Sequence, residues 1–477
     1  MASLFGLMRR AGGPRSPVSA RPGFWGGFDL KKLFLNLAAF AVLSVLLQFA
    51  EKSQLGQRTL DKGYDYLVRR NFVHAVLERG EAEPLSPDLS LVIFDPGLYQ
   101  RSYTKGLWTP RDEVGLAVLN ALRRGAKVVL IDFNFQGEAP VVWQDGRAID
   151  GNQKFLEYLG QAAELARANQ AVILVPAPNP KKAPPGYLEL LKRFGDVFPP
   201  ADFEARRDKY DGQVRRLSWC GKSGDAAKCD IRGDGPVLSA GLLSVLLIGQ
   251  ADKAAAVKEA QGLLDGEVDE PRLLPPALAR AIKKGNQEVS SRLIFRYLPR
   301  GTIRELKNEP HRRGDLDKGF IWWPGQLTGR NQEPDFSGKI VLIGSDYADN
   351  GDIHQTTFGS LAGSYILANG LNMMLTGRML KENKGLNWTL LVLTGLVASF
   401  SYTRFTIYGT TSFFAGVGLV SLWLSAWTFN RWGFVVDVWL PALGPAVYNA
   451  GATYVVWQFQ HGTVAWLLTY FRRKKDG

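Results

Sequence analysis

The sequence predicts a mixed α/β domain with a mostly parallel sheet, joined to an α-helical membrane region with one N-terminal and three C-terminal transmembrane helices. Two observations indicate this architecture. In the middle of the chain, short apolar runs alternate with stretches of helical spacing, which is the pattern of strand–helix–strand units in a parallel sheet. Before and after this region lie apolar segments long enough to cross a bilayer.

Each element of the domain is predicted from its local pattern. Continuous apolar runs are typical of strands buried on both faces, and they occupy 89–94, 126–131, 171–175 and 339–343. Helical spacing with one apolar face predicts helices over 111–124, 152–169 and 363–380. The whole domain is expected to span 51–385. Its less regular part, 176–330, is interpreted as an insertion or subdomain over the sheet.

Four apolar segments are expected to cross the bilayer as helices: 33–50, 386–402, 408–429 and 434–457. We interpret the first as an uncleaved anchor rather than a signal peptide, because some thirty residues precede it and QFAEKS is a poor cleavage site. Asp437 lies near the start of the last segment. An interfacial carboxylate and a functional coupling residue are both compatible with that position.

The distribution of positive charge sets the expected orientation and argues against a nucleic-acid partner. The formal net charge is +13, but residues 1–50 hold six Arg and Lys against one Asp, and residues 386–477 hold six against two. Such an excess is typical of the cytoplasmic flanks of membrane helices. We therefore expect the basic tail 1–32 and the interfacial segment and basic tail 458–477 in the cytoplasm, and the large domain outside it.

The chain has two cysteines, Cys220 and Cys229, in the stretch CGKSGDAAKC. Their spacing is not that of a zinc site. If the domain is extracytoplasmic, a disulfide bond that closes this polar loop is the natural interpretation. Two free thiols are the alternative.

Motifs of common catalytic sites are absent from the sequence, so no enzyme activity and no particular cofactor is predicted. It contains no Walker A loop, no HExxH and no GxSxG, and GxGxxG follows none of the expected strands. Its four histidines are widely spaced.

Polar residues follow the expected strands, at the edge where open α/β sheets bind ligands. The ligand-binding candidates after the strands and before the first helix are Asp95, Trp108, Arg111, Asp132, Ser345 and Asp346. Arg111 could pair with these carboxylates or hold an anion, while Asp352 and His354 in the next loop are weak metal-ligand candidates. The alternative is that the aspartates cap turns and Arg111 is a fixed ion-pair partner.

The order of several motifs resembles the CHASE2 family of extracytoplasmic sensory domains. The motifs are LVIFD, WTPRD and GAKVVLIDFNF within 88–138, then SGKIVLIG, DIHQTTFG and AGSYILANGLNMMLTGRML within 336–380, followed by three hydrophobic segments. The resemblance implies a multi-pass protein of the bacterial inner membrane whose outer domain senses a signal. In that family the signal usually passes to a cytoplasmic kinase or cyclase. Only 20 residues follow Trp457 here, so we expect action through separate partner proteins.

The sequence is compatible with two functions. The first is a sensory or binding module that contacts the lipid bilayer and relays its state to a membrane or envelope protein, with homo-oligomerisation as a further possibility. The second is a structural or scaffolding subunit of a larger envelope assembly. A transporter is disfavoured, because four spans with one marginal carboxylate, Asp437, offer little pathway.

Overall fold

The structure is a computed structural model. It describes residues 61–70, 85–94, 109–135, 141–203, 206–220, 231–249, 252–292, 334–346 and 352–377, with gaps at 63, 145–146, 208–210, 212, 233–234, 270 and 286–289. It also describes 321–322, 381–382 and isolated residues between 389 and 435. The chain divides into two compact units. One comprises Met1–Ala50, Lys384–Leu422 and Asp437–Gly477, and the other comprises Glu51–Asn383 and Trp423–Val436.

A five-stranded parallel sheet forms the centre of the second unit. Its strand order is β11-β1-β12-β2-β5, and every pairing within it is parallel. The strands are β1 (Leu89–Phe94), β2 (Val128–Ile131), β5 (Val172–Leu174), β11 (Ile321–Trp322) and β12 (Ile340–Ser345). All residues of β1, β2, β5 and β12 are buried. This confirms the prediction of a mostly parallel sheet, and it explains why these strands read as continuous apolar runs.

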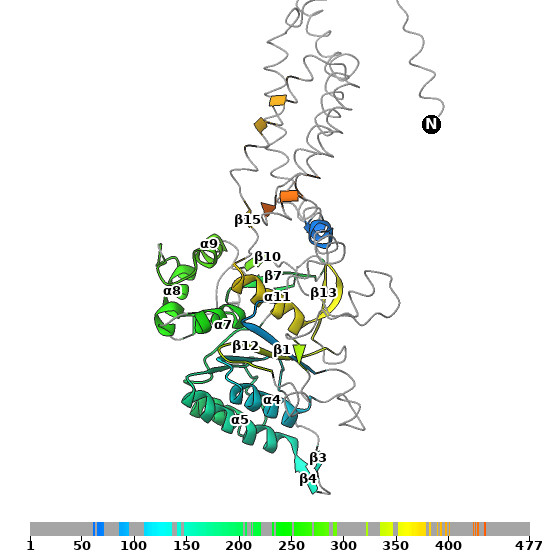
Figure 1. Ribbon diagram of the computed structural model, residues 1–477, viewed down its shortest axis with the longest axis vertical. Helices are drawn as coiled ribbons and strands as arrows, with labels where there is room; N and C mark the ends of the chain where they lie inside the picture. Colours follow the sequence, from blue (N-terminus) through cyan, green and yellow to red (C-terminus); the bar gives the residue numbers. More distant parts are fainter. Residues whose placement is uncertain are drawn as a thin grey trace, which may run out of the picture. The chain divides into compact units, whose positions relative to one another are not determined.

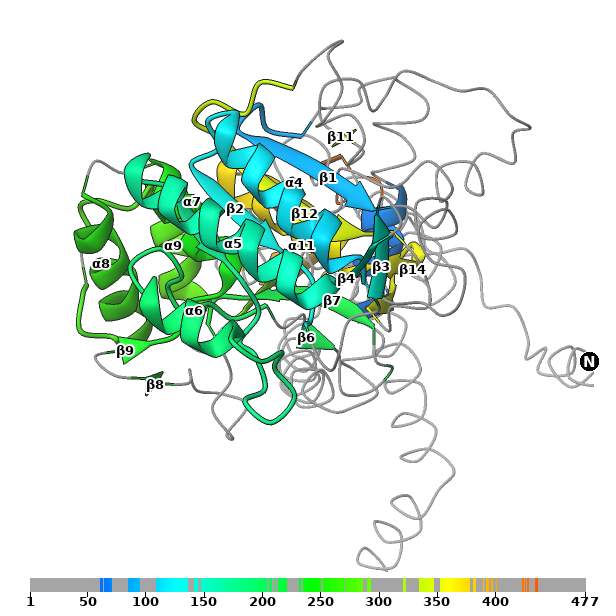
Figure 2. The ribbon, with the colours of Figure 1, turned by 90° about the horizontal axis from the view of Figure 1, so that it is seen from below.

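Helices cover both faces of this sheet (Figure 1), and successive strand residues point to opposite faces. On one face, Val92, Val129 and Val341 pack against α4 (Arg111–Arg123) and α5 (Gly151–Ala168). On the other face, Leu91, Leu130 and Leu342 pack against α7 (Ala240–Gly249) and α11 (Gly363–Leu375). Figure 2, seen from below, shows α4 and α5 lying side by side across the strands.

The predicted helix boundaries differ from the observed ones at their ends. The helix expected over 111–124 ends at Arg123 and is followed by Gly125 with φ +86°, a conformation that glycine adopts without strain. The helix expected over 363–380 ends at Leu375, two residues before Gly377 with φ +64°. In both places a left-handed glycine stops the helix.

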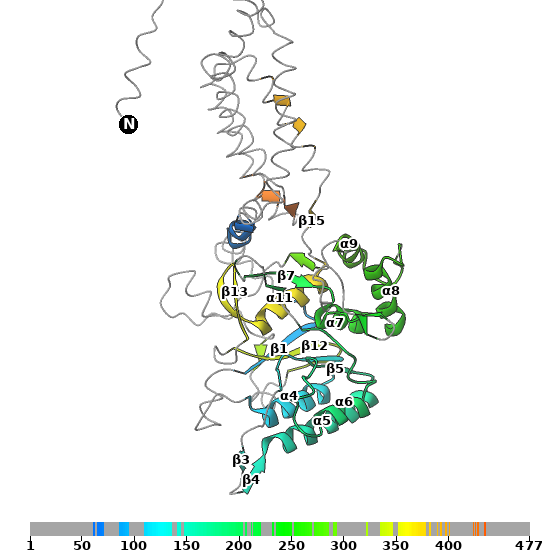
Figure 3. The same ribbon diagram turned by 180° about the vertical axis from the view of Figure 1, so that it is seen from behind.

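The region 176–330 contains short helices and small antiparallel sheets, and it also supplies β11 to the central sheet. Its helices are α6 (Tyr187–Arg193), α7, α8 (Lys253–Asp265) and α9 (Pro276–Gly285). A three-stranded sheet has the order β10-β7-β6, formed by Ser290–Arg292, Val214–Ser218 and Arg206–Arg207. Ile231–Arg232 and Gly235–Pro236 form the pair β8–β9. Figure 3 shows α8 and α9 beside α7.

Three further strand pairs lie outside this region. Val141–Gln144 and Arg147–Asp150 form the antiparallel pair β3–β4, which leads into α5. The antiparallel hairpin of β13 (Ile353–Thr356) and β14 (Gly359–Ala362) leads directly into α11. The parallel pair β15–β16 joins Lys381–Glu382 to Phe434–Val435.

Among the described residues, no helix has both the length and the apolar character needed to cross a membrane. Apart from isolated positions, the four segments expected to be membrane helices lie outside the described residues. Some of these positions are helical, and their large apolar side chains are exposed. Examples are Val392, Leu393, Leu396 and Val397, with exposed fractions of 45% to 52%.

Candidate functional site

The carboxyl ends of β2 and β12 meet the first turn of α11 at one edge of the sheet. Asp132 directly follows β2, and Ser345 is the last residue of β12. Ser364 lies in the first turn of α11. Ser364 Oγ donates a hydrogen bond of 2.9 Å to Asp132 Oδ2 and accepts one of 3.2 Å from the Ser345 backbone N–H. Two of the predicted ligand candidates, Asp132 and Ser345, are therefore held together by a serine from a third element.

Gly344 in β12 makes this close approach possible. A Cβ atom at position 344 would lie 2.6 Å from Ser364 Cβ and would collide with its hydroxyl. The same Cβ would lie 3.6 Å from Asp132 Cβ, at ordinary contact distance. The absence of a side chain at this position thus lets α11 come down onto the sheet edge.

A second carboxylate lies against the N-terminus of α11. The backbone N–H of Gly363 donates to the backbone carbonyl of Asp352 at 2.9 Å, and a Cβ atom on Gly363 would collide with the Asp352 carboxylate. Asp352 Oδ1 is 2.9 Å from Nε2 of His354. A carboxylate is stabilised at a helix N-terminus, where the unpaired backbone N–H groups give a positive potential. We call Asp132, Ser364, Asp352 and His354 the carboxyl cluster.

Burial dominates the electrostatics of Asp132. Burial and, to a smaller extent, the nearby Asp352 carboxylate together raise the pKa of Asp132 to about 7, although the hydrogen bond from Ser364 opposes the shift. Two carboxylates close together in a poorly solvated place resist being ionised at the same time. The charge of Asp132 therefore changes near neutral pH.

His354 has one ring nitrogen that is engaged and one that is not. Its Nε2 faces Asp352, while its Nδ1 is buried without a hydrogen-bond partner among the described residues. If Nε2 carries the proton and donates it to Asp352, Nδ1 of the neutral ring is a hydrogen-bond acceptor. The cluster then presents acceptors from both Asp132 and His354.

The other predicted candidate that follows β12 is fixed by the same helix. Tyr365 Oη donates to Asp346 Oδ2 at 3.1 Å, and the Asp346 backbone N–H donates to the Phe94 carbonyl at 3.1 Å. Asp346 is thus held next to the end of β1 by a side chain of the first turn of α11.

Arg111 occupies a different environment, between two helices. It is the first residue of α4, its side chain is buried, and its guanidinium donates a hydrogen bond to Asn152 Oδ1 in the first turn of α5. Burial lowers the pKa of Arg111, and Tyr187 and Asp150 act in the opposite direction. This contact joins α4 to α5.

The remaining predicted site residues are only partly described. Asp95, Trp108 and Cys229 lie outside the described residues. Cys220 is fully buried and takes part in a disulfide bond. Within the described part of the chain, no group of three or more His, Cys, Asp or Glu side chains is placed to hold a metal ion. Asp352 and His354 contact each other there.

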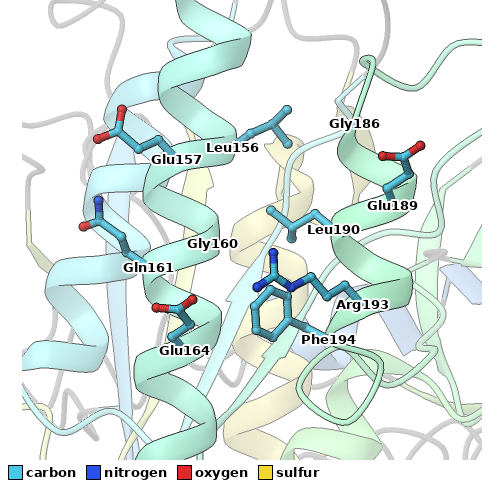
Figure 4. Close-up of a pocket in the computed structure, with 10 residues that line it drawn as sticks. All are labelled: Leu156, Glu157, Gly160, Gln161, Glu164, Gly186, Glu189, Leu190, Arg193 and Phe194. Atoms are coloured by element: carbon cyan, nitrogen blue, oxygen red, sulfur yellow. The ribbon is translucent and has the colours of Figure 1, made fainter.

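A groove of about 420 Å³ lies between α5 and α6, and none of its lining residues belongs to the carboxyl cluster (Figure 4). Leu156, Leu190 and Phe194 give it an apolar floor, and Gly160 leaves room between the helices. Its polar lining consists of Glu157, Gln161, Glu164, Glu189 and Arg193. The guanidinium of Arg193 lies over the Phe194 ring, 5.1 Å from its centroid. An apolar floor with polar residues around it is suited to binding another molecule. The lining contains no pairing of a nucleophile with a general base that would indicate a catalytic site.

The sequence pattern does not single out Ser364 and Tyr365, the two residues of α11 that hold Asp132 and Asp346. Both lie in the motif AGSYILANG at the start of a predicted helix. Polar residues in a first helical turn are common, so this signal alone did not distinguish them.

A comparison with known protein families identifies the chain. The CHASE2 domain matches residues 37–402, which is more than half of the chain and includes both the sheet and the carboxyl cluster. Neither the curated proteins nor the solved structures contain a match. The match confirms the resemblance drawn from the motifs, and the chain belongs to the CHASE2 family of extracytoplasmic sensory domains.

Proposed function

We propose that this protein is a membrane-anchored sensory module whose extracytoplasmic domain binds a signal and which acts through separate partner proteins, without enzymatic activity. Membership of a sensory domain family supports the general function. The single observation that carries the proposal is the carboxyl cluster. It combines two carboxylates and a histidine at the first turn of α11, close to the carboxyl edge of the sheet.

The chemistry of the carboxyl cluster favours a ligand rich in hydrogen-bond donors. Asp132 and Asp352 supply acceptor oxygens, and His354 Nδ1 is a buried acceptor in the tautomer that donates to Asp352. A cationic or multiply donating small ligand would complement all three groups. We propose Asp132, Ser345 and Asp346 as its neighbours, and Asp95, Trp108 and Arg111 as further candidates from the same strand and helix ends.

Membrane anchoring rests on the four apolar segments of the sequence, and two structural observations support it. Val392, Leu393, Leu396 and Val397 are helical and expose apolar side chains, as a helix face in contact with lipid does. The parallel pairing of Lys381 with Phe434 joins the chain just before segment 386–402 to the start of segment 434–457. These two ends would lie on the same side of a membrane in the proposed topology.

The alternative is a structural subunit of an envelope assembly, and the groove between α5 and α6 favours it. The groove combines an apolar floor of Leu156, Leu190 and Phe194 with the acidic residues Glu157, Glu164 and Glu189 (Figure 4). An apolar centre with a polar rim is typical of protein contact surfaces. In that function the carboxyl cluster would serve packing only.

Affinity purification of the full-length protein in mild detergent, followed by mass spectrometry, tests the two functions. The wild type is compared with Asp132→Asn in the carboxyl cluster and with Glu164→Gln/Glu189→Gln in the groove. A kinase, cyclase or regulator whose recovery changes only with Asp132→Asn supports the sensory function. A stoichiometric set of envelope proteins that is lost only with the groove variant contradicts it and supports the structural alternative.

A further inference from the structure

We propose that the β13–β14 hairpin is a mechanical link that couples the carboxyl cluster to the helical segment 61–70. The proposal rests on the sensory function, because it describes how a change at the cluster would reach another part of the same domain. It concerns coupling within the chain, so it can be tested without knowing the ligand or the partner.

One end of the hairpin belongs to the carboxyl cluster. Asp352 directly precedes β13, and His354 is its second residue. The pairing of Ile353 with Ala362 closes this end, and the next residue, Gly363, begins α11. A change in the position or charge of Asp352 therefore acts directly on the end of the hairpin that lies next to α11.

The turn at the other end contacts the segment 61–70. Thr357 Oγ1 donates a hydrogen bond of 2.8 Å to Asp65 Oδ1, across 292 residues of sequence. The turn itself is fixed, because Thr356 Oγ1 donates to the Gly359 carbonyl at 2.9 Å and accepts from the Phe358 N–H at 3.1 Å. Figures 1 and 3 show β13 running between the core and this blue helical segment.

Asp65 is held rigidly on its other side. Arg215 in β7 donates to both oxygens of its carboxylate, from Nε at 2.9 Å and 3.1 Å and from Nη2 at 2.7 Å, and it donates two further hydrogen bonds to Asp211. The Arg215 side chain is only 4% exposed. Burial alone would lower the pKa of Arg215, but the hydrogen bonds to Asp65 and Asp211 outweigh it, so the pKa is raised and the ion pair persists.

The geometry makes the hairpin suitable for transmitting a displacement. Four residue pairs connect its ends, from Ile353–Ala362 to Thr356–Gly359, so the two strands offer a continuous hydrogen-bonded path along which a displacement can pass. The segment 61–70 follows the apolar stretch 33–50 in the chain, and α11 precedes 386–402. The hairpin thus joins the parts of the domain that lead to two of the proposed membrane segments.

The simpler interpretation is that the Thr357–Asp65 contact only stabilises the domain. The two interpretations differ in one measurable respect. A purely stabilising contact leaves segment 61–70 insensitive to a change at the carboxyl cluster. A link makes segment 61–70 respond to that change, and the response requires the Thr357 hydroxyl.

Amide hydrogen exchange of the full-length protein in detergent, followed by mass spectrometry, measures this response. Ser364→Ala perturbs the cluster, because it removes the donor to Asp132. We expect roughly tenfold faster exchange in peptides covering 61–70, as for the loss of one hydrogen bond to a charged group. Thr357→Val should speed exchange there as well, and adding Ser364→Ala to it should have no further effect at 61–70.

Two further variants complete the test. Thr357→Ser keeps the hydroxyl and should restore the response to Ser364→Ala. Thr376→Val makes the same substitution at the far end of α11, where the hydroxyl donates to the Asn372 carbonyl, and should leave 61–70 unchanged. If Ser364→Ala fails to fold, Asp132→Asn perturbs the same contact. Unchanged exchange at 61–70, or effects that multiply independently in the double variant, would overturn the link while leaving the sensory function intact.

Discussion

Ser364 donates a hydrogen bond to Asp132, a residue 232 positions earlier in the sequence, and so joins the first turn of α11 to the end of β2. The contact leaves Asp132 in surroundings where its negative charge is poorly solvated, and burial raises its pKa to about 7. This carboxyl group should therefore contribute to the dependence of the domain's stability on pH.

We predict that Asp132→Asn removes a pH-dependent loss of stability. The unfolded chain ionises Asp132 near pH 3.8, but the folded chain does so near pH 7. Protonated Asp132 therefore adds to the free energy of unfolding. This stabilisation is fully present below pH 3.8 and is lost as the pH rises to about 7. The loss amounts to about 4 kcal/mol at most. Urea unfolding between pH 4 and pH 8 should give the Asp132→Asn variant a higher free energy of unfolding than the wild type at high pH. At low pH the two proteins should be equally stable.

Asp196→Asn is the control for this prediction, with the opposite sign. The hydrogen bond from Arg167 lowers the pKa of Asp196, so this exposed carboxylate stabilises the fold above its ordinary pKa and loses the effect as the pH falls. A pH slope in Asp132→Asn equal to that of the wild type would contradict our account of Asp132.

We predict that Gly344→Ala destabilises the domain by about 1–3 kcal/mol, the usual cost of overpacking. The added Cβ would meet Ser364 Cβ at 2.6 Å and would force α11 away from the sheet edge. Gly160→Ala in α5 is the matched control, because its Cβ would meet only Leu190 Cδ1 at 3.8 Å. The control should stabilise the helix by about 0.5–1 kcal/mol. Thermal unfolding of both variants measures the difference, and equal midpoints would refute the steric explanation.

The sequence was a good guide to the central sheet and a poor one to the site contacts. Leu89–Phe94 and Ile340–Ser345 are continuous apolar runs because helices cover both faces of each strand, and this burial is visible in composition alone. The strand β11 (Ile321–Trp322) is two residues long and gives no periodic signal. The sequence therefore does not distinguish this strand within the predicted insertion.

The candidate site shows the same limit. The position of Asp132 after a buried strand identified it as a candidate, because the ends of parallel strands share one edge. Its partner Ser364 could not be found that way, because the contact depends on how α11 packs on Gly344. The hydrogen bond from Arg111 to Asn152 in α5 could not be predicted either, because it depends on how the two helices pack. Tertiary packing decides such contacts.

We predict that Asp65→Asn costs about 3 kcal/mol of folding stability, because it leaves the buried Arg215 without one of the two carboxylates that contact it among the described residues. Arg215 is 4% exposed and Asp65 is 19% exposed. Arg167→Gln breaks the ion pair between Arg167 and Asp196. Both of these side chains are at least half exposed, so this substitution should change stability little. Urea unfolding compares the two. Equal effects would mean that the Asp65–Arg215 pair contributes no more than a surface pair.

We predict that Cys220 pairs with Cys229, and that this bond closes the loop between β7 and β8. Cys220 is buried and disulfide-bonded, and Cys229 is the only other cysteine of the chain. Peptide mapping without reduction should recover a linked peptide containing both residues. Cys220→Ser/Cys229→Ser should lower stability by about 2–3 kcal/mol, since the loop regains freedom in the unfolded chain. Recovery of both cysteines as free thiols from non-reduced protein would refute the pairing.

We predict that the chain crosses the membrane four times, with 51–385 outside the cytoplasm. The parallel pairing of Lys381 with Phe434 requires the chain before 386–402 and the start of 434–457 to lie on one side. Single cysteines introduced at Lys62 or Glu189 of a cysteine-free variant should react with an impermeant thiol reagent added to intact spheroplasts, since both side chains are exposed. Cysteines at Arg15 and Lys475 should react only after permeabilisation, because the positive charge around them favours the cytoplasm. Thiol labelling of the variant with a cysteine at position 475 in intact spheroplasts would indicate an odd number of spans and would exclude this topology.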